Sequence, residues 1–185
     1  MFLEEIWSRN FTNLFIAPIK ISEIITSLTL TAILRTLIGL VPATILAVPL
    51  FGVSVFELGL PLLFLLISLY LFGITLGLFV SAGLIRFGPS FENIAWSSLF
   101  LLAPLGCIYY PIEILPNFFQ IIAKGLPLVY IFDETRNILL NGFIDYKNLK
   151  QAYFLNLIYL TFGIGLFYYS FLKARIKGTL INMGE

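Results

Sequence analysis

An uncharged apolar run from Leu58 to Ile85 constrains this chain more than any other feature. It contains 28 residues and no Asp, Glu, Lys or Arg. About 20 predominantly apolar residues allow an α-helix to cross the hydrocarbon core of a bilayer. The rest of the chain has the same character, since 59% of its 185 residues are hydrophobic, 11% are charged and its mean hydropathy is +1.00. The sequence therefore predicts an all-α, polytopic helical membrane protein with a single transmembrane domain over residues 1–185.

Four segments are apolar and long enough to be transmembrane spans, namely 24–50, 60–84, 94–112 and 152–172. Pro42 and Pro49 are expected to kink or end the far half of the first span. In the second span, Gly73, Gly77 and Ser81 recur at every fourth position. Small residues at this spacing permit close helix packing. We expect such packing either within the chain or at a dimer seam.

Arg35 is the one basic residue inside a predicted span. A charge near the middle of a membrane is costly and usually marks a functional residue that faces a cavity. If the helix begins near Ile24, however, Arg35 lies about two to three turns from the surface, and its side chain can extend to the interface. The sequence leaves both interpretations open.

The region 113–142 follows the third predicted span and is interrupted by prolines. Its apolar residues recur at helical spacing. This predicts one short helix opened by Pro116 and a second from about Leu128 to Leu140, just after Pro127 and closed by Gly142. Each would be about 15–20 Å long, too short to cross about 30 Å of hydrocarbon. We expect an external re-entrant or interfacial hairpin before the last span.

Charged residues gather in and next to this hairpin. Asp133, Glu134 and Arg136 lie in its second half, and Glu113 lies at its start. Paired carboxylates can act as acid and base, but adjacent positions on a helix point apart. A salt-bridged structural cluster is therefore favoured over a catalytic site. The candidate residues for the pathway or the hairpin are Arg35, Glu113, Pro116, Pro127, Asp133, Glu134 and Arg136.

The composition excludes several functions. The sequence contains no histidine, and its one cysteine, Cys107, lies in an apolar run. A disulfide framework and a metal cluster are therefore excluded. The motifs of P-loop nucleotide binding, serine hydrolases and zinc proteases are absent. A net charge of +1 gives no reason to expect nucleic-acid binding. We expect no catalytic residue, no metal and no cofactor.

Residues 1–18 predict an amphipathic helix that lies along the membrane surface and is anchored by Trp7. Its polar face carries Glu4, Glu5 and Arg9. Such mixed charge suits a protein partner better than anionic lipid. A solvated face on a membrane-surface helix is an equally good interpretation of the pattern.

Four spans would leave both termini on the same side of the membrane. Six Lys and Arg residues outside the spans lie on that side, against four in the long loop on the other side. The positive-inside rule then predicts that both termini are cytoplasmic and that the hairpin is outside. The protein is expected in the cell membrane as a multi-pass protein.

Three segments, in this order, resemble permease subunits of the ABC-2 type, the membrane half of ATP-binding-cassette exporters. The first, EEIWSRNFTNLFIAPIKISE, is similar to the cytoplasmic connecting helix of the family. The second, LFVSAGLIRFGPSFENIAW, is similar to an uncharged span that ends in a short turn before another span. The third and most specific is PIEILPNFFQIIAKGLPLVYIFDETRNILLNG, with matching positions at Pro111, Pro116, Pro127, Leu128, Arg136, Leu139, Leu140 and Gly142.

The resemblance implies a non-catalytic subunit that forms an export pathway for a lipid-linked glycan, a drug-like amphiphile or another hydrophobic compound. Its partners would be a P-loop ATPase, a second permease subunit in a homodimer or heterodimer, and membrane lipids. By the same resemblance, the ATPase would dock on Glu4, Glu5, Trp7, Arg9, Asn10 and Asn13. Family members usually have two spans before the connecting helix, so the resemblance also indicates that these two spans are missing here.

Two other functions stay open at this point. A membrane enzyme that acts on lipids would use Glu113, Asp133 or Glu134 as acid or base. A structural or assembly membrane protein, or a fragment without independent transport activity, would have neither an ATPase partner nor a substrate.

Overall fold

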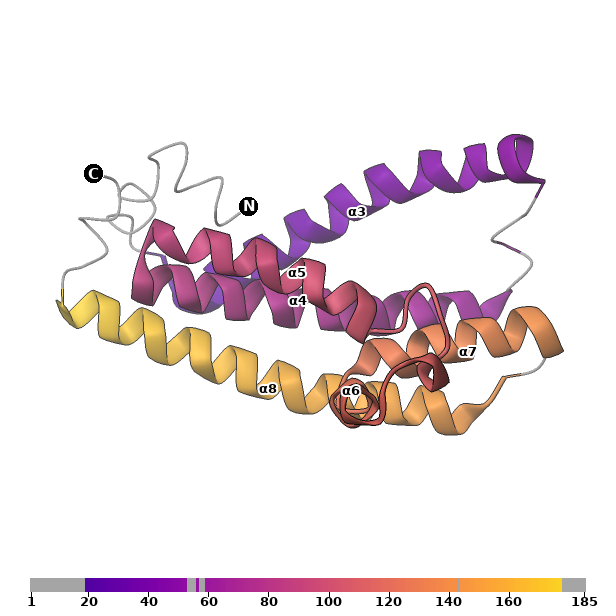
Figure 1. Ribbon diagram of the computed structural model, residues 1–185. Helices are drawn as coiled ribbons and strands as arrows, with labels where there is room; N and C mark the ends of the chain where they lie inside the picture. Colours follow the sequence, from indigo (N-terminus) through magenta and orange to yellow (C-terminus); the bar gives the residue numbers. More distant parts are fainter. Residues whose placement is uncertain (1–18, 53–55, 57–58, 143, 178–185) are drawn as a thin grey trace.

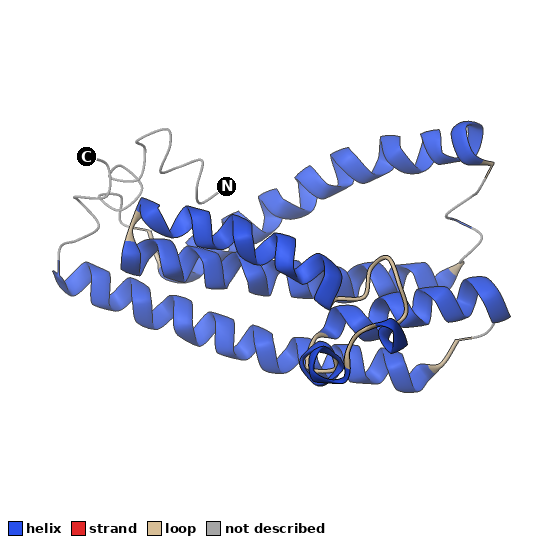
Figure 2. Cartoon of the chain, viewed as in Figure 1, coloured by secondary structure: helices blue, strands red, loops and turns tan. Residues whose placement is uncertain are grey.

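The computed structural model describes residues 19–52, 56, 59–142 and 144–177, and every regular element in this part of the chain is helical (Figures 1 and 2). The α-helices are α3 (Ile21–Phe51), α4 (Leu60–Phe87), α5 (Glu92–Leu105), α6 (Asn117–Ala123), α7 (Pro127–Asn141) and α8 (Tyr146–Lys177). Two short 3₁₀ helices are η2 (Pro89–Phe91) and η3 (Ile112–Ile114). The predicted all-α class is confirmed for the described residues. The amphipathic helix predicted for residues 1–18 lies outside them.

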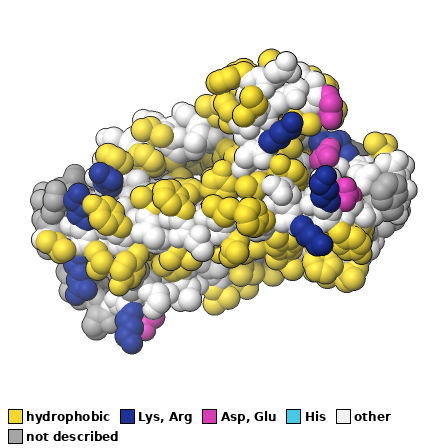
Figure 3. All heavy atoms as spheres, turned by 90° about the horizontal axis from the view of Figure 1, so that it is seen from below, with side chains coloured by type: hydrophobic (Ala, Val, Ile, Leu, Met, Phe, Trp, Pro, Cys, Tyr) yellow, Lys and Arg dark blue, Asp and Glu magenta, His cyan; other side chains and the backbone are white. Residues whose placement is uncertain are grey.

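Three of these helices are long and apolar enough to cross a membrane, namely Ser22–Leu50 within α3, Leu60–Phe87 as α4, and Tyr146–Ile176 within α8. They contain three of the predicted spans, 24–50, 60–84 and 152–172. On the face shown in Figure 3, charged side chains gather toward the two ends, with a band of hydrophobic and uncharged side chains between them. This distribution suits a protein that crosses a bilayer.

The predicted span 94–112 is an α-helix only as far as Leu105. α5 has 14 residues and ends at Leu105, so it is about 21 Å long and shorter than about 30 Å of hydrocarbon. Pro104 lies in its last turn, and the N–H of Gly106 bonds to the carbonyl of Leu102 to close the helix. Cys107 then turns the chain with a left-handed φ of 53°. By length, α5 is not among the candidate spans of the described residues.

Prolines have less effect on α3 than expected. The helix continues through both Pro42 and Pro49, and it ends only at Phe51. Gly52 closes it in the left-handed conformation, where its N–H donates to the carbonyl of Val48. Pro42 therefore does not end the helix, whereas Pro49 lies two residues before its end, and a kink at either proline stays a prediction.

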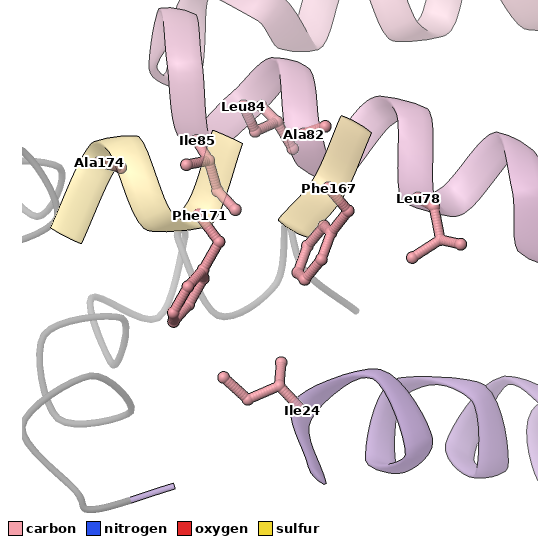
Figure 4. Packing of buried hydrophobic residues seen from close by; sticks show 8 residues of the cluster. All are labelled: Ile24, Leu78, Ala82, Leu84, Ile85, Phe167, Phe171 and Ala174. Atoms are coloured by element: carbon pink, nitrogen blue, oxygen red, sulfur yellow. The ribbon is translucent and has the colours of Figure 1, made fainter. Parts of the chain in front are cut away.

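α4 and α8 form the centre of the fold. They lie side by side and run in the same direction (Figure 1). Aromatic rings of the two helices meet edge to face, Phe72 on Tyr159 and Phe79 on Phe162. The largest buried cluster is drawn in Figure 4 and comprises Ile24, Leu78, Ala82, Leu84, Ile85, Phe167, Phe171 and Ala174. It brings the start of α3, the end of α4 and the end of α8 to one end of the bundle.

The opposite end of the bundle holds α7. A second buried cluster joins Leu65 near the start of α4, Ile131 of α7 and Ala152 near the start of α8. η2 and α5 return along α4 from the first end toward this one (Figure 1). The hairpin region therefore lies at the end opposite to the start of α3 and the end of α8.

The C-terminal end of α3 diverges from α4 (Figure 1). An apolar groove of about 640 Å³ lies between them, and Gly73, Gly77 and Ser81 are part of its lining. A Cβ atom added at either glycine would meet no heavy atom within 4 Å. Tyr70 reaches across and donates its hydroxyl to the carbonyl of Ala32 at 2.6 Å. Among the described residues, close packing within the chain is therefore not found at the two glycines, whereas Ser81 is buried, and a dimer seam there stays a prediction.

Gly83 offers a direct test of packing between α4 and η2. A Cβ atom at Gly83 would overlap the ring of Phe91, which also stacks on Phe87 at 5.7 Å between ring centroids. We expect Gly83→Val to displace Phe91 and to lower the free energy of unfolding by about 1–3 kcal/mol, as in other overpacked sites. Thermal unfolding in mild detergent measures the change. Gly73→Val, with open space at its Cβ, is the control, and an equal loss in both variants would contradict the prediction.

Candidate functional site

α6 and α7, which we call the hairpin, are two short helices joined by the turn at Gly125, and their ends follow from prolines and glycines. Pro116 precedes α6 as its N-cap, and Pro127 is the first residue of α7, where its missing N–H removes no helical hydrogen bond. Gly142 closes α7 with a left-handed φ of 73° and donates its N–H to the carbonyl of Ile138. Two short helices lie within 113–142 as predicted, but α6 has 7 residues and is therefore shorter than the predicted length of about 15–20 Å, whereas α7 has 15 residues. Their depth in the membrane stays a prediction.

Glu134 is the buried charge of this hairpin. Its side chain projects from α7 toward the start of α8 and is 1% exposed. Oε1 accepts the backbone N–H of Asp145 at 2.6 Å, and Oε2 accepts from Nδ2 of Asn148 at 3.3 Å. Asp145 also accepts the backbone N–H of Lys147 at 2.8 Å. Because the N-terminal N–H groups of a helix lack helical partners, carboxylates at this position stabilise the helix start.

Arg136 ties the hairpin to the segment that precedes it. Its Nη1 donates to the carbonyl of Cys107 at 2.9 Å, across 29 positions of sequence. Its Nη2 lies 3.6 Å from Oδ1 of Asp133, one turn away on α7. Cys107 is fully buried and packs with Ala123 and Val129 of the hairpin. The guanidinium therefore holds the left-handed turn after α5 against α7.

Asn148 joins the two neighbouring carboxylates. Its Nδ2 lies 3.3 Å from Glu134 and 3.5 Å from Oδ2 of Asp133. The sequence predicts that Asp133 and Glu134 point apart. Asp133 pairs with Arg136 and Glu134 bonds to the backbone of Asp145, but the side-chain amide of Asn148 lies within reach of both carboxylates. Sequence reasoning missed Asn148 and Asp145, which lie beyond the hairpin. Asp145 just before an apolar helix is the signal that points to a helix cap, and Asn148 lies in the first turn of that helix.

This geometry suits a clamp better than a reaction centre. Both oxygens of Glu134 and Nη1 of Arg136 are hydrogen-bonded within the fold, whereas Nη2 of Arg136 is buried and has only the ion pair at 3.6 Å. In the described residues, no three potential ligands from His, Cys, Asp and Glu come together to hold a metal. Glu134 binds the helix that follows the hairpin, and Arg136 binds the turn that precedes it. The cluster thus fixes the hairpin at both of its connections.

The other candidate residues lie apart from this clamp. Arg35 is on the exposed side of α3, and it is not part of the groove lining. Glu113 and Pro116 are exposed near the start of the hairpin, whereas Pro127 is buried. The predicted docking residues Glu4, Glu5, Trp7, Arg9, Asn10 and Asn13 lie outside the described residues.

Comparison with known sequences gives one match. Residues 1–140 match the sequence profile of the ABC-2 type transporter family. The matched range includes α3, α4, α5, α6 and nearly all of α7. Neither the curated proteins nor the solved structures contain a match to this chain.

Proposed function

The chain belongs to the ABC-2 type transporter family, and from this premise we propose that it is the permease subunit of an exporter powered by a separate cytoplasmic ATPase. The observation that carries the proposal is the match itself, which extends through the hairpin clamp at Asp133, Glu134 and Arg136. A multi-pass membrane protein of this family is a transmembrane component of a transporter, so its contribution is the pathway. The ATPase would supply the energy.

The arrangement of the helix ends supports the proposed orientation. The start of α3 and the end of α8 share one end of the bundle, and the hairpin lies at the other. We propose that α5, with the turn that follows it, carries the chain back across the membrane as a fourth crossing. Both termini then face the cytoplasm in the cell membrane, and the hairpin caps the pathway from outside.

Export of an amphiphile or lipid-linked glycan requires a pathway that opens to the two sides of the membrane in turn. We propose that a second permease subunit, identical or different, completes the pathway. ATPase closure would reach the spans as rigid-body motion through residues 1–18. Glu4, Glu5, Trp7, Arg9, Asn10 and Asn13 would form the contact with the ATPase.

Purification of the tagged full chain from its native cells in mild detergent tests the proposal. We expect a P-loop ATPase to copurify, and we expect Trp7→Ala and Arg9→Glu to reduce its recovery about tenfold or more, since interface anchors of these types commonly contribute 2 kcal/mol or more. Mass spectrometry of the copurified proteins is the measurement. Arg175→Glu, a charge reversal on the same predicted side, is the control.

Two outcomes would count against the proposal. Recovery of the chain without any ATPase would favour a structural or assembly protein. Recovery of the ATPase at wild-type level in both N-terminal variants would keep the transporter assignment but move the docking site away from residues 1–18.

A further inference from the structure

Three polar side chains of α8 point from one side of the helix to main-chain carbonyls of other elements. They are Tyr153, Asn156 and Tyr159, which are spaced by three residues and lie within an apolar span. Helix positions three apart are neighbours on one face. We call these three residues the α8 seam. They serve no role in the clamp described above.

The first two members of the α8 seam bond to α4. The hydroxyl of Tyr153 donates to the carbonyl of Phe64 at 2.8 Å. Nδ2 of Asn156 donates to the carbonyl of Ser68 at 2.9 Å and lies 2.8 Å from its Oγ. Phe64 and Ser68 are one helical turn apart, so the two bonds fix both the rotation and the longitudinal position of α8 against α4.

The third member bonds to the hairpin. The hydroxyl of Tyr159 donates to the carbonyl of Gly125, in the turn between α6 and α7, at 3.0 Å. The ring of the same tyrosine rests edge-on against Phe72 of α4, with 6.4 Å between ring centroids. The orientation of this hydroxyl therefore depends on how α4 and α8 are aligned.

Asn156 is the central residue of the α8 seam, because both Asn156 and its partner Ser68 are buried. Asn156 is 1% exposed, and Ser68 is fully buried. In the described part of the chain, Oδ1 of Asn156 has no hydrogen-bond donor. Polar groups inside a membrane-spanning helix are expensive and are retained where they contribute to function or specificity. Leucine at position 156 would remove both the bonds to Ser68 and the Oδ1 atom that has no donor.

We propose that Tyr153, Asn156 and Tyr159 are positioning residues that make the hairpin follow the α4–α8 pair, so that a shift between these two helices changes how firmly the hairpin is seated. The proposal rests on the proposed function, in which the hairpin caps the pathway and the spans move. The α8 seam would then carry that motion to the cap.

Two reporters test the proposal in membranes from cells that produce the full chain. A Cβ at Gly163 would lie 3.6 Å from Cβ of Leu78, which suits a disulfide. Leu78→Cys with Gly163→Cys, in a Cys107→Ser background, therefore reports the alignment of α4 and α8. The native Cys107, buried against Ala123 and Val129, reports the seating of the hairpin through its rate of maleimide labelling.

Asn156→Leu is expected to slow formation of the reporter disulfide and to speed labelling of Cys107, although the bonds from Nδ2 of Asn156 go to Ser68 of α4 and not to the hairpin. Tyr159→Phe should speed labelling alone. We expect an increase of about threefold or more in each case, the size that one interhelical hydrogen bond in a membrane protein supports. Tyr168→Phe, a half-exposed tyrosine of the same helix, is the control and should change neither reporter.

The proposal is overturned if Asn156→Leu leaves Cys107 labelling at the wild-type rate, whether or not the disulfide slows. If Asn156→Leu does not accumulate in the membrane, Ser68→Ala removes the Oγ contact alone and must show the same two changes in smaller size. Neither reporter needs an ATPase or transport. Failure of the proposed exporter function would therefore be detected separately, by the absence of an ATPase in the copurification experiment.

Discussion

Glu134→Lys is expected to prevent the hairpin from seating on α8 and to lower the free energy of unfolding by about 3 kcal/mol or more. The replaced carboxylate is 1% exposed and accepts bonds from the backbone of Asp145 and the amide of Asn148. An ammonium in its place would face two donors without an acceptor. Buried polar groups that lose their partners carry the full cost of desolvation.

Two further variants sharpen this result. Glu134→Gln keeps one acceptor oxygen and is expected to be intermediate. Glu113→Lys reverses an exposed charge in η3 and should leave the melting temperature nearly unchanged. Thermal unfolding in mild detergent, together with the amount of protein in the membrane, provides the measurement. Similar behaviour of Glu134→Lys and Glu113→Lys would show that the clamp does not hold the hairpin.

Arg136→Met is expected to release the turn after α5. Methionine keeps much of the apolar stem but removes the donor to the Cys107 carbonyl, at 2.9 Å, and the ion pair with Asp133. A hydrogen bond from a charged donor contributes about 1.5–3 kcal/mol. Because about 1.4 kcal/mol corresponds to tenfold in an equilibrium constant, labelling of the buried Cys107 should rise by about tenfold or more.

The matched variants separate the two contacts of Arg136. Asp133→Asn removes only the pair at 3.6 Å, between side chains that are 26% and 45% exposed, and such exposed pairs contribute below about 1 kcal/mol. Arg136→Lys keeps the charge but loses the planar fork, so partial release is expected. If Asp133→Asn labels as fast as Arg136→Met, the carbonyl bond is not what holds the turn.

Local signals predicted the hairpin well. Pro116, Pro127 and Gly142 stand at the ends of α6 and α7 because proline lacks an N–H and glycine accepts a positive φ, and both properties act within a few residues. The same reasoning failed after α5. Pro104 and Gly106 end α5 within an apolar segment, and a span prediction from apolar character alone passes over this helix stop.

The contacts of the clamp and of the α8 seam could not be predicted from the sequence. Arg136 finds its acceptor on the backbone of Cys107, and Tyr159 finds its acceptor on the backbone of Gly125. A main-chain carbonyl is present at every residue, so the sequence carries no mark of which one is used. The charge of Glu134 was visible, but its partner Asn148 is determined by the angle between α7 and α8.

The pairing of α4 with α8 has a consequence for biosynthesis. Ser68 and Asn156 are 88 positions apart, so α4 is released from the ribosome well before its partner exists. Ser68 and the buried Thr75 must meanwhile face lipid, an insertion factor or a temporary neighbour. Residues 1–140, the part that matches the family, end before α8 begins. A nascent chain of that length would hold nearly every element of the hairpin and none of the helix that seats it.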